Sequence, residues 1–448
     1  MLLTARYVIP VSAAHIEHGA VLVRGDEIVE VGEFERLHEA YPDEPVRDFG
    51  LAALMPGFVD LHTHLEYSAM RGLVDDLPYS RWKLQLMGLE QRFDRTDWRD
   101  SALLGALEAL QSGITTVADI TGSGASAGAV SVAGLRAFVF REVSTMEKPA
   151  IDGVMAEAIH DIDSWQSIDS DRLTVGIAPH APYSCHPELF RRVADYANES
   201  GRPAAMHLAG SKEEYAFVKY GSSRLAVDFR EEYEGHAPAW LPTGVSPVRY
   251  VLQWGLFDVP ELLAVHLTQV DDADIEVLAS KDVAVAYCPR CNAKLAMGLA
   301  PLTKFLNAGM RVGIGTDSPA ASNSMDMFEE MRVGLLLQRA VLGEDTWLPA
   351  RQFVKLATLD AARALRMDDR IGSLDAGKQA DIIAVDLSHS HQVPTHYPYS
   401  TILHTANQEN VLFTMVAGDV LYDSGVCATL DAERLLSRAE EMRLKLRS

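Results

Sequence analysis

The sequence predicts a (β/α)₈ TIM barrel joined to a small β-sandwich domain that both ends of the chain build. Eight short apolar runs alternate with amphipathic stretches in the middle of the chain, as in a barrel of parallel strands. Strand-like runs with turn signals precede this region and return after it. We therefore expect residues 54–370 to form the barrel, and residues 1–53 and 371–448 to form the β-domain.

The two ends of the chain share the same strand-and-turn character. Residues 20–29 contain two strand-like runs on either side of Gly25-Asp26, a dipeptide typical of a tight hairpin turn. Residues 381–385 and 410–416 are apolar and β-branched in the same way. We expect these distant segments to pair in one small domain beside the barrel.

Each barrel strand is predicted from a run of apolar and β-branched residues. The first run, residues 51–59, continues directly into the polar segment that holds His62 and His64. The other seven runs are residues 115–118, 137–140, 174–178, 204–207, 262–266, 283–287 and 312–317. Amphipathic stretches between them, such as 100–112 and 187–200, are expected to be helices outside the barrel.

The composition is typical of a globular protein and argues against several functional classes. Hydrophobic residues make up 48% and charged residues 23% of the chain, and no apolar run is long enough to span a membrane. The formal net charge of −23 argues against a nucleic-acid partner or an anionic membrane surface. Four cysteines do not suggest a disulfide framework, and no signal-peptide pattern is present. We expect a cytoplasmic protein.

Polar residues at the ends of five predicted strands suggest a metal site. His62 and His64 follow the first strand two residues apart, so both side chains should emerge on one face. The other metal-competent residues at strand ends are His180, His207, His266 and Asp317. Any one of them alone is more often structural, but catalytic residues of such barrels gather at the C-terminal ends of the strands. Their agreement favours a metal centre.

The residue types indicate which metal would bind. Three imidazoles and one carboxylate suit Zn²⁺ and also Fe²⁺. A second ion would need a bridging ligand after the fourth strand, typically a modified lysine, and residues 176–183 contain no lysine. We therefore predict one divalent ion, which lowers the pKa of bound water to about 7 and supplies hydroxide. Asp317 is the expected general base, and His266 would orient the hydroxide or polarise the group that it attacks.

Five segments spread over nearly the whole chain carry a further resemblance: residues 56–64, 179–183, 288–292, 313–318 and 372–381. They resemble the amidohydrolase superfamily, in the branch with adenosine-type, methylthioadenosine/S-adenosylhomocysteine and aminofutalosine deaminases and the triazine chlorohydrolases. The resemblance implies a β-sandwich from both termini and a homo-oligomer, a dimer or larger. It also implies that His180 contacts substrate and that the metal ligands are His62, His64, His207 and Asp317.

One position departs from the pattern of this superfamily. The fifth-strand histidine is usually the start of His-x-x-Glu, in which the glutamate moves protons to the ring nitrogen and the leaving group. Gly210 stands at the place of that glutamate. General acid–base groups contribute about 10²–10⁴-fold in rate. The chain would therefore be an impaired enzyme unless another carboxylate has taken over this role.

Four residues are candidates for substrate binding: Glu66, His180, Arg141 and Arg290. Glu66 would share a face with the first-strand histidines if that strand stays extended, and could then bind a substrate hydroxyl or amine or move a proton. The alternative is a solvated glutamate at the rim. Arg141 ends the third strand beside Glu142, and either could bind a polar substrate group or form a salt bridge. Arg290 lies in the loop after the seventh strand.

These features together predict a metal-dependent hydrolytic deaminase of an aminated heterocycle, such as an aminopurine or a nucleoside-like compound. Hydroxide would attack an amidine-like ring carbon, and ammonia would leave. Dechlorination of a halogenated ring is the alternative within the family. A metal-binding pseudoenzyme is the alternative from another class: Gly210 favours it, whereas the complete metal set with His266 and Asp317 favours an enzyme.

Overall fold

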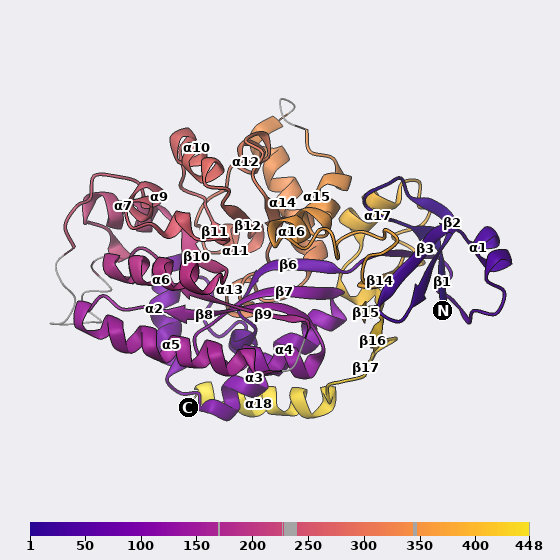
Figure 1. Cartoon of the computed structure of the whole chain (residues 1–448), viewed down its shortest axis with the longest axis horizontal. Coiled ribbons are helices and arrows are strands. Elements are labelled where there is room, and N and C mark those ends of the chain that lie inside the picture. Colours follow the sequence, from indigo (N-terminus) through magenta and orange to yellow (C-terminus); the bar gives the residue numbers. More distant parts are fainter. Residues whose placement is uncertain (169–170, 226, 228–239, 344–346, 448) are drawn as a thin grey trace.

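The computed structural model describes residues 1–168, 171–225, 227, 240–343 and 347–447. In this part the chain forms an eight-stranded parallel barrel surrounded by helices, with a nine-stranded sheet at one end (Figure 1). The predicted fold class is confirmed. No helix of the described residues is long and apolar enough to cross a membrane.

The barrel strands follow one another around the barrel in chain order. They are β6 (Phe58–Thr63), β7 (Ile114–Thr121), β8 (Arg136–Val143), β9 (Leu173–Pro179), β10 (Ala204–Leu208), β11 (Leu262–His266), β12 (Ala284–Tyr287) and β13 (Val312–Ile314). The last strand returns to the first. Just after β13, the amide of Asp317 donates to the carbonyl of His62 in β6 at 2.8 Å. This bond brings residues from opposite ends of the barrel sequence side by side.

The first predicted run, residues 51–59, is two strands and not one. β5 (Ala52–Pro56) belongs to the nine-stranded sheet, and β6 begins in the barrel at Phe58. The apolar run is continuous because every residue of both strands is buried. Between them, a Cβ atom on Gly57 would lie 2.1 Å from the side chain of Thr115. Only glycine fits this close approach of the two sheets.

Helices cover the outside of the barrel (Figure 1). They are α2 (Tyr79–Glu90), α3 (Arg95–Gln111), α4 (Ala125–Ala133), α5 (Ile151–Gln166), α6 (Pro187–Ser200), α7 (Lys212–Tyr220), α9 (Pro247–Leu252), α10 (Asp272–Ser280), α11 (Pro289–Lys294), α12 (Leu302–Asn307), α13 (Pro319–Ser322), α14 (Met327–Leu342), α15 (Ala350–Leu356) and α16 (Leu359–Ala364). Local sequence signals explain several of their starts. The Asp94 carboxylate accepts from the amides of Thr96 and Asp97 at the start of α3, and Pro187 opens α6.

The two ends of the chain form one nine-stranded sheet. Its strands are β1 (Leu2–Val8), β2 (Ile16–Arg24), β3 (Glu27–Glu33), β4 (Val46–Asp48), β5, β14 (Ile382–Asp386), β15 (Val411–Val416), β16 (Asp419–Asp423) and β17 (Val426–Cys427). The N-terminal and C-terminal halves join where β5 and β14 pair antiparallel. Helix α1 (Phe34–Ala40) packs on β2 and β3, whereas α17 (Pro398–Thr405) packs on α14 and α15.

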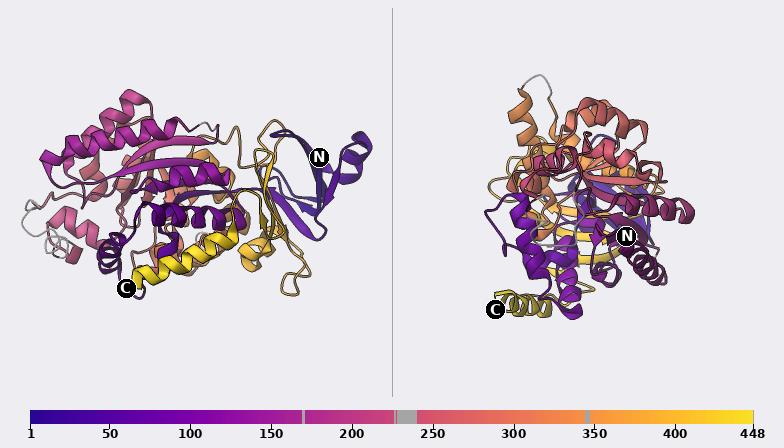
Figure 2. Two further views of the ribbon diagram at one scale, coloured as in Figure 1. Left: turned by 90° about the horizontal axis from the view of Figure 1, so that it is seen from below. Right: turned by 90° about the vertical axis from the view of Figure 1, so that its left-hand side faces the viewer.

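The C-terminal helix leaves this sheet. Helix α18 (Ala432–Arg447) runs along α3 on the outside of the barrel (Figure 2). Arg438 of α18 lies 3.1 Å from Asp97 and 2.9 Å from Asp100 of α3. Residues 432–447, which the sequence assigned to the β-domain, therefore pack against the barrel because their basic side chains face an acidic helix there.

A buried ion pair joins the sheet to the barrel. Arg136 at the start of β8 makes two contacts of 3.1 Å with the carboxylate of Asp381, directly before β14. Both side chains are only 2% exposed. Asp381 also accepts from the amide of Ala417 through its side chain and from the amide of Gly57 through its carbonyl. Because these contacts lie at the N-terminal ends of the barrel strands, the C-terminal ends face away from the sheet.

We expect Arg136→Met to lower the free energy of unfolding by about 3–5 kcal/mol, because the Asp381 carboxylate would stay buried without its cation. Urea unfolding followed by circular dichroism measures this change. Arg192→Met, which removes an exposed ion pair with Asp152, is the control and should cost less than about 1 kcal/mol. Equal effects of the two substitutions would contradict a structural role for the buried pair.

Candidate metal centre

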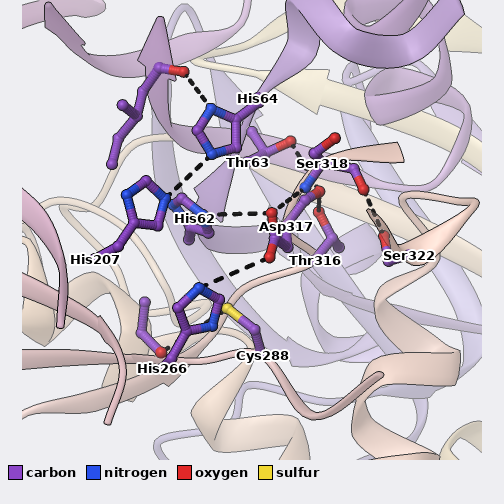
Figure 3. Close-up of polar contacts among 12 residues, drawn as sticks. His62, Thr63, His64, His207, His266, Cys288, Thr316, Asp317, Ser318 and Ser322 are labelled. Atoms are coloured by element: carbon purple, nitrogen blue, oxygen red, sulfur yellow. Dashed lines mark hydrogen bonds and ion pairs between the residues drawn. The ribbon is translucent and has the colours of Figure 1, made fainter. Parts of the chain in front are cut away.

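Four side chains from three strand ends converge at the C-terminal end of the barrel (Figure 3). His62 lies in β6 and His64 directly after it, His207 lies in β10, and Asp317 follows β13. The Nε2 atoms of His64 and His207 are 3.3 Å apart, and Nε2 of His62 is 3.5 Å from Oδ1 of Asp317. The ligand atoms of the three histidines all lie within 4.8 Å of one another. The structure thus brings the four predicted ligands together.

Backbone carbonyl groups orient two of the imidazoles. Nδ1 of His64 lies 2.7 Å from the carbonyl oxygen of Ile120, and Nδ1 of His207 lies 3.0 Å from that of His180. A carbonyl can only accept, so each Nδ1 carries the proton and each Nε2 presents its lone pair to the centre. Such second partners hold metal-binding histidines in a fixed tautomer and ring orientation.

His62 supplies the strongest sign that a cation belongs at this site. Its side chain is fully buried, and neither ring nitrogen has a hydrogen-bond partner among the described residues. Buried polar atoms without a partner are costly and uncommon in native proteins. A divalent ion between His62, His64, His207 and Asp317 would give one of these two nitrogens a partner. The residues present therefore fit the metal that the sequence predicts.

The protonation states also suit a metal. Burial, together with the charge of neighbouring His62, lowers the pKa of His64 to about 3. Burial and the surrounding imidazoles hold the pKa of His207 well below its usual value. Burial alone would raise the pKa of Asp317, but the nearby His62, whose Nε2 lies 3.5 Å from its carboxylate, holds that pKa well below the ordinary range. Neutral imidazoles and an ionised carboxylate are the donor set that Zn²⁺ and Fe²⁺ accept.

The backbone is strained where it presents these groups. Asp317 has a φ of 60°, His266 a φ of 76° and Ala209 a φ of 49°, all in the left-handed region that non-glycine residues rarely adopt. Strained residues of this kind persist only where the surrounding structure holds them, and they cluster at active sites. Three such residues at one rim mark it as functional.

Two further histidines line the same cavity. Nδ1 of His266 is 2.9 Å from Oδ1 of Asn292, its Nε2 is 4.0 Å from Oδ2 of Asp317, and burial lowers its pKa to about 4. His180 holds the hydroxyl of Ser184 at 2.6 Å from its Nδ1. The same cavity is lined by His64, His207 and Asp317. A substrate contact of His180 and His266 stays a prediction.

Glu66 does not line this cavity. The strand stops at Thr63, and a 3₁₀ helix begins at Leu65, so the alternation from His62 and His64 does not extend to residue 66. The Glu66 side chain is buried, with 1% exposure, and accepts hydrogen bonds from the Thr121 hydroxyl and the Gly122 amide. It is not a solvated rim residue. Its contacts hold the turn that follows β7.

Neither predicted arginine reaches the cavity. The guanidinium of Arg141 lies 2.7 Å from Asp161 of α5, outside the barrel. Glu142, the next residue, lines the cavity, since successive residues of a strand face opposite sides. Arg290 pairs with Glu329 at 3.2 Å and donates to a backbone carbonyl, also away from the cavity. Side chains alternate between two faces along β8. Ala137 and Val139, which share a face with Arg141, pack against helices, so this alternation could have distinguished Arg141 from Glu142.

Glu142 is a carboxylate of the cavity that the sequence analysis mentioned only beside Arg141 and did not count among its four candidates for substrate binding. One of its oxygens lies within 4.8 Å of ring nitrogens of both His180 and His207. Burial raises its pKa from the ordinary value to about 7, and the charge of Lys83 opposes this shift. Lys83 on α2 also lines the cavity. No motif in the sequence marked Lys83, because its placement depends on how α2 covers the rim.

Gly210 lies against the cavity wall. A Cβ atom on Gly210 would lie 3.2 Å from Cδ2 of His266 and 2.9 Å from the terminal methyl of Met297. Glu214, four residues further along the chain, accepts from the amides of Ala209 and Gly210 at 2.8 and 2.9 Å. The Glu214 carboxylate is thus engaged by the backbone and does not replace the missing side chain in the cavity.

Comparisons with known proteins agree with this geometry. The amidohydrolase family matches residues 53–421, and a bacterial imidazolonepropionase-like composite domain matches residues 19–43. A 5-methylthioadenosine/S-adenosylhomocysteine deaminase of Moorella thermoacetica is 34% identical over 433 residues, which cover 96% of each chain. A protein of the same name from Bacillus cereus is also 34% identical, over 95% of this chain and 94% of its own.

Solved structures show the same architecture. An adenosine deaminase from Xanthomonas campestris with bound zinc has a TM-score of 0.87 at 31% identity, over 100% of this chain and 98% of that one. An atrazine chlorohydrolase from Arthrobacter aurescens complexed with zinc has a TM-score of 0.83 at 23% identity, over 98% and 99% of the two chains. At that identity the likeness extends to the fold alone. The family match at residues 53–421 spans the barrel and all four candidate metal ligands, and the chain therefore belongs to the amidohydrolase family.

Proposed function

We propose that this protein is a hydrolytic deaminase of an aminated heterocycle, an aminopurine or nucleoside-like compound, and that it uses one divalent ion, zinc. The observation that carries the proposal is the cluster of His62, His64 and His207 beside the ionised Asp317, at a cavity at the C-terminal end of the barrel. Tyr79 and Trp82 of α2 offer flat apolar surfaces to a ring in that cavity. Relatives that are named deaminases over nearly their whole length support the same chemistry.

The residues divide the work of hydrolysis among them. A divalent ion bound by the four ligands would supply an activated water. Asp317 is ionised and stands beside His62 and His266, so it can accept the proton that this water loses. His180 lies on the wall next to His207 and can hold the heterocycle by a hydrogen bond. The bond from the Asp317 amide to the His62 carbonyl and the contact of His266 with Asn292 keep these groups in place before substrate binds.

Glu142 supplies the proton that Gly210 cannot. Deamination requires a proton on a ring nitrogen and on the departing amine, and residue 210 has no side chain to carry one. The Glu142 carboxyl lies beside His180 and His207 in the cavity, and its pKa of about 7 leaves it partly protonated at neutral pH. Groups with a pKa near the working pH are the most effective proton donors. This assignment favours an enzyme over a pseudoenzyme.

Loss of either a histidine or the carboxylate ligand should remove both metal and activity. We expect His62→Ala and Asp317→Asn to release little ammonia from aminopurine nucleosides and to retain less zinc than the wild-type protein, because each removes one donor from the site. Elemental analysis of the purified proteins and an ammonia assay measure the two effects. His160→Ala, which removes an exposed imidazole on α5, is the control. Full turnover by Asp317→Asn would contradict the assigned mechanism.

The role of Glu142 is tested by loss and rescue. We expect Glu142→Gln to lower kcat by about 10²-fold, because glutamine keeps the shape but not the transferable proton. Wild-type kcat should fall as the pH rises through about 7, where Glu142 loses its proton, and Glu142→Gln should lack this decline. Steady-state ammonia release across pH measures both.

A carboxylate introduced at position 210 should restore the activity that Glu142→Gln loses. Adding Gly210→Glu to Glu142→Gln should restore activity, since the new side chain would enter beside His266 after a small shift of the Met297 methyl. Adding Gly210→Gln should not, because an amide fills the same space without donating a proton. Unchanged kcat in Glu142→Gln, or equal rescue by glutamate and glutamine, would refute this role for Glu142.

A further inference from the structure

One helix contributes a single cation to the wall of the cavity. On α2, the side chains of Tyr79, Trp82, Lys83 and Leu86 line the cavity together, at the spacing of one helical face. The other three are aromatic or aliphatic. Lys83 is therefore the only charged residue of this otherwise apolar helical face that lines the cavity.

Lys83 has no partner that explains its position. It is half-buried, and it forms no hydrogen bond or ion pair with any residue in the described ranges. Other lysines of the chain do form such contacts, for example Lys294 with Asp75 at 2.7 Å and Lys281 with Asp258 at 2.5 Å. An ammonium that is partly removed from water without a counter-ion is unfavourable. A ligand that brought an anion to Lys83 would remove this cost.

The two acids that line the same cavity, Glu142 and Asp317, do not supply that anion. The positive charge of Lys83 is felt by Glu142, His64 and His180, so Lys83 faces the same space as the metal site. Yet Glu142 makes no ion pair with it, and the Glu142 carboxylate lies instead close to ring nitrogens of His180 and His207. The carboxylate of Asp317 is held by His62 and by the amide of Ser318. Lys83 is thus left for the substrate.

We propose that Lys83 binds an anionic group on the substrate, so that the substrate is an aminated heterocycle whose substituent carries a carboxylate or a phosphate. The inference rests on the proposed deaminase function and names a part of the substrate which that function leaves open. The ring lies at the imidazoles and Asp317, and the substituent extends along α2 toward Lys83. Tyr79 and Trp82 line the same cavity and offer apolar surface to the substrate.

The test compares two nucleosides that differ in charge and hardly in shape, adenosine-5′-carboxylate and adenosine-5′-carboxamide. We expect the wild-type protein to favour the carboxylate by about tenfold in kcat/KM, the size of one added charge-assisted contact. Lys83→Met should bring that ratio close to one by weakening only the carboxylate, and Lys83→Arg should retain the preference. Arg81→Met removes an exposed cation from the same helix and should leave the ratio unchanged. Adenosine 5′-monophosphate, assayed in parallel, distinguishes a phosphate site from a carboxylate site.

Every outcome of this comparison supports or contradicts the proposed role of Lys83. A wild-type protein that treats the carboxylate and the carboxamide alike, or a Lys83→Met variant that loses both equally, would overturn the inference while leaving the deaminase proposal intact. If neither compound releases ammonia, calorimetric binding of the same pair to wild type and Lys83→Met still measures the preference. Absence of binding by both compounds would refute the inference together with the proposed substrate class.

Discussion

The site depends on the meeting of several imidazole lone pairs in a small buried volume. Imidazole rings that face one another in this way gain nothing from each other, and the ring nitrogens of His62 have no hydrogen-bond partner among the described residues. The fold holds them there by other means. Carbonyl groups of Ile120 and His180 fix two rings from behind, and the bond from the Asp317 amide to His62 closes the barrel at the same place. A cation bound at this candidate site would stabilise this otherwise unfavourable arrangement.

The arrangement of the strand ends was predictable because two simple periodicities govern it. Side chains alternate along a strand, and parallel strands present their C-terminal ends at one rim, so His62, His64, His207 and Asp317 could be placed before any coordinates. The pairing of the two chain ends was also foreseen, because both show the same strand-like composition. The bounds of β5 and β6 were not predicted, because a continuous run of buried apolar residues does not show that the chain passes from one sheet to another at Gly57.

Residues just beyond the strands were harder to place, for reasons that are local. Glu66 was assigned by extending an alternation that ends where a 3₁₀ helix starts. Arg141 and Glu142 are adjacent in β8, so their side chains face opposite sides of the barrel wall. An error of one residue in the predicted alternation therefore places the wrong side chain in the cavity. Lys83 gave no signal at all, because its exposure to the cavity depends on the path of the loop before α2. The path of that loop cannot be predicted from composition.

The joining of the chain ends has a consequence for how the protein is made. β5 pairs with β14 on one side, and the buried Arg136–Asp381 pair spans 245 residues of sequence. On a ribosome, residues 1–56 emerge first, yet this edge of their sheet stays open until nearly all of the chain has been synthesised. A nascent chain that stalls inside the barrel presents a bare apolar strand edge, the kind of surface that chaperones cover and that aggregates otherwise. Completion of the enzyme is thereby tied to completion of its translation.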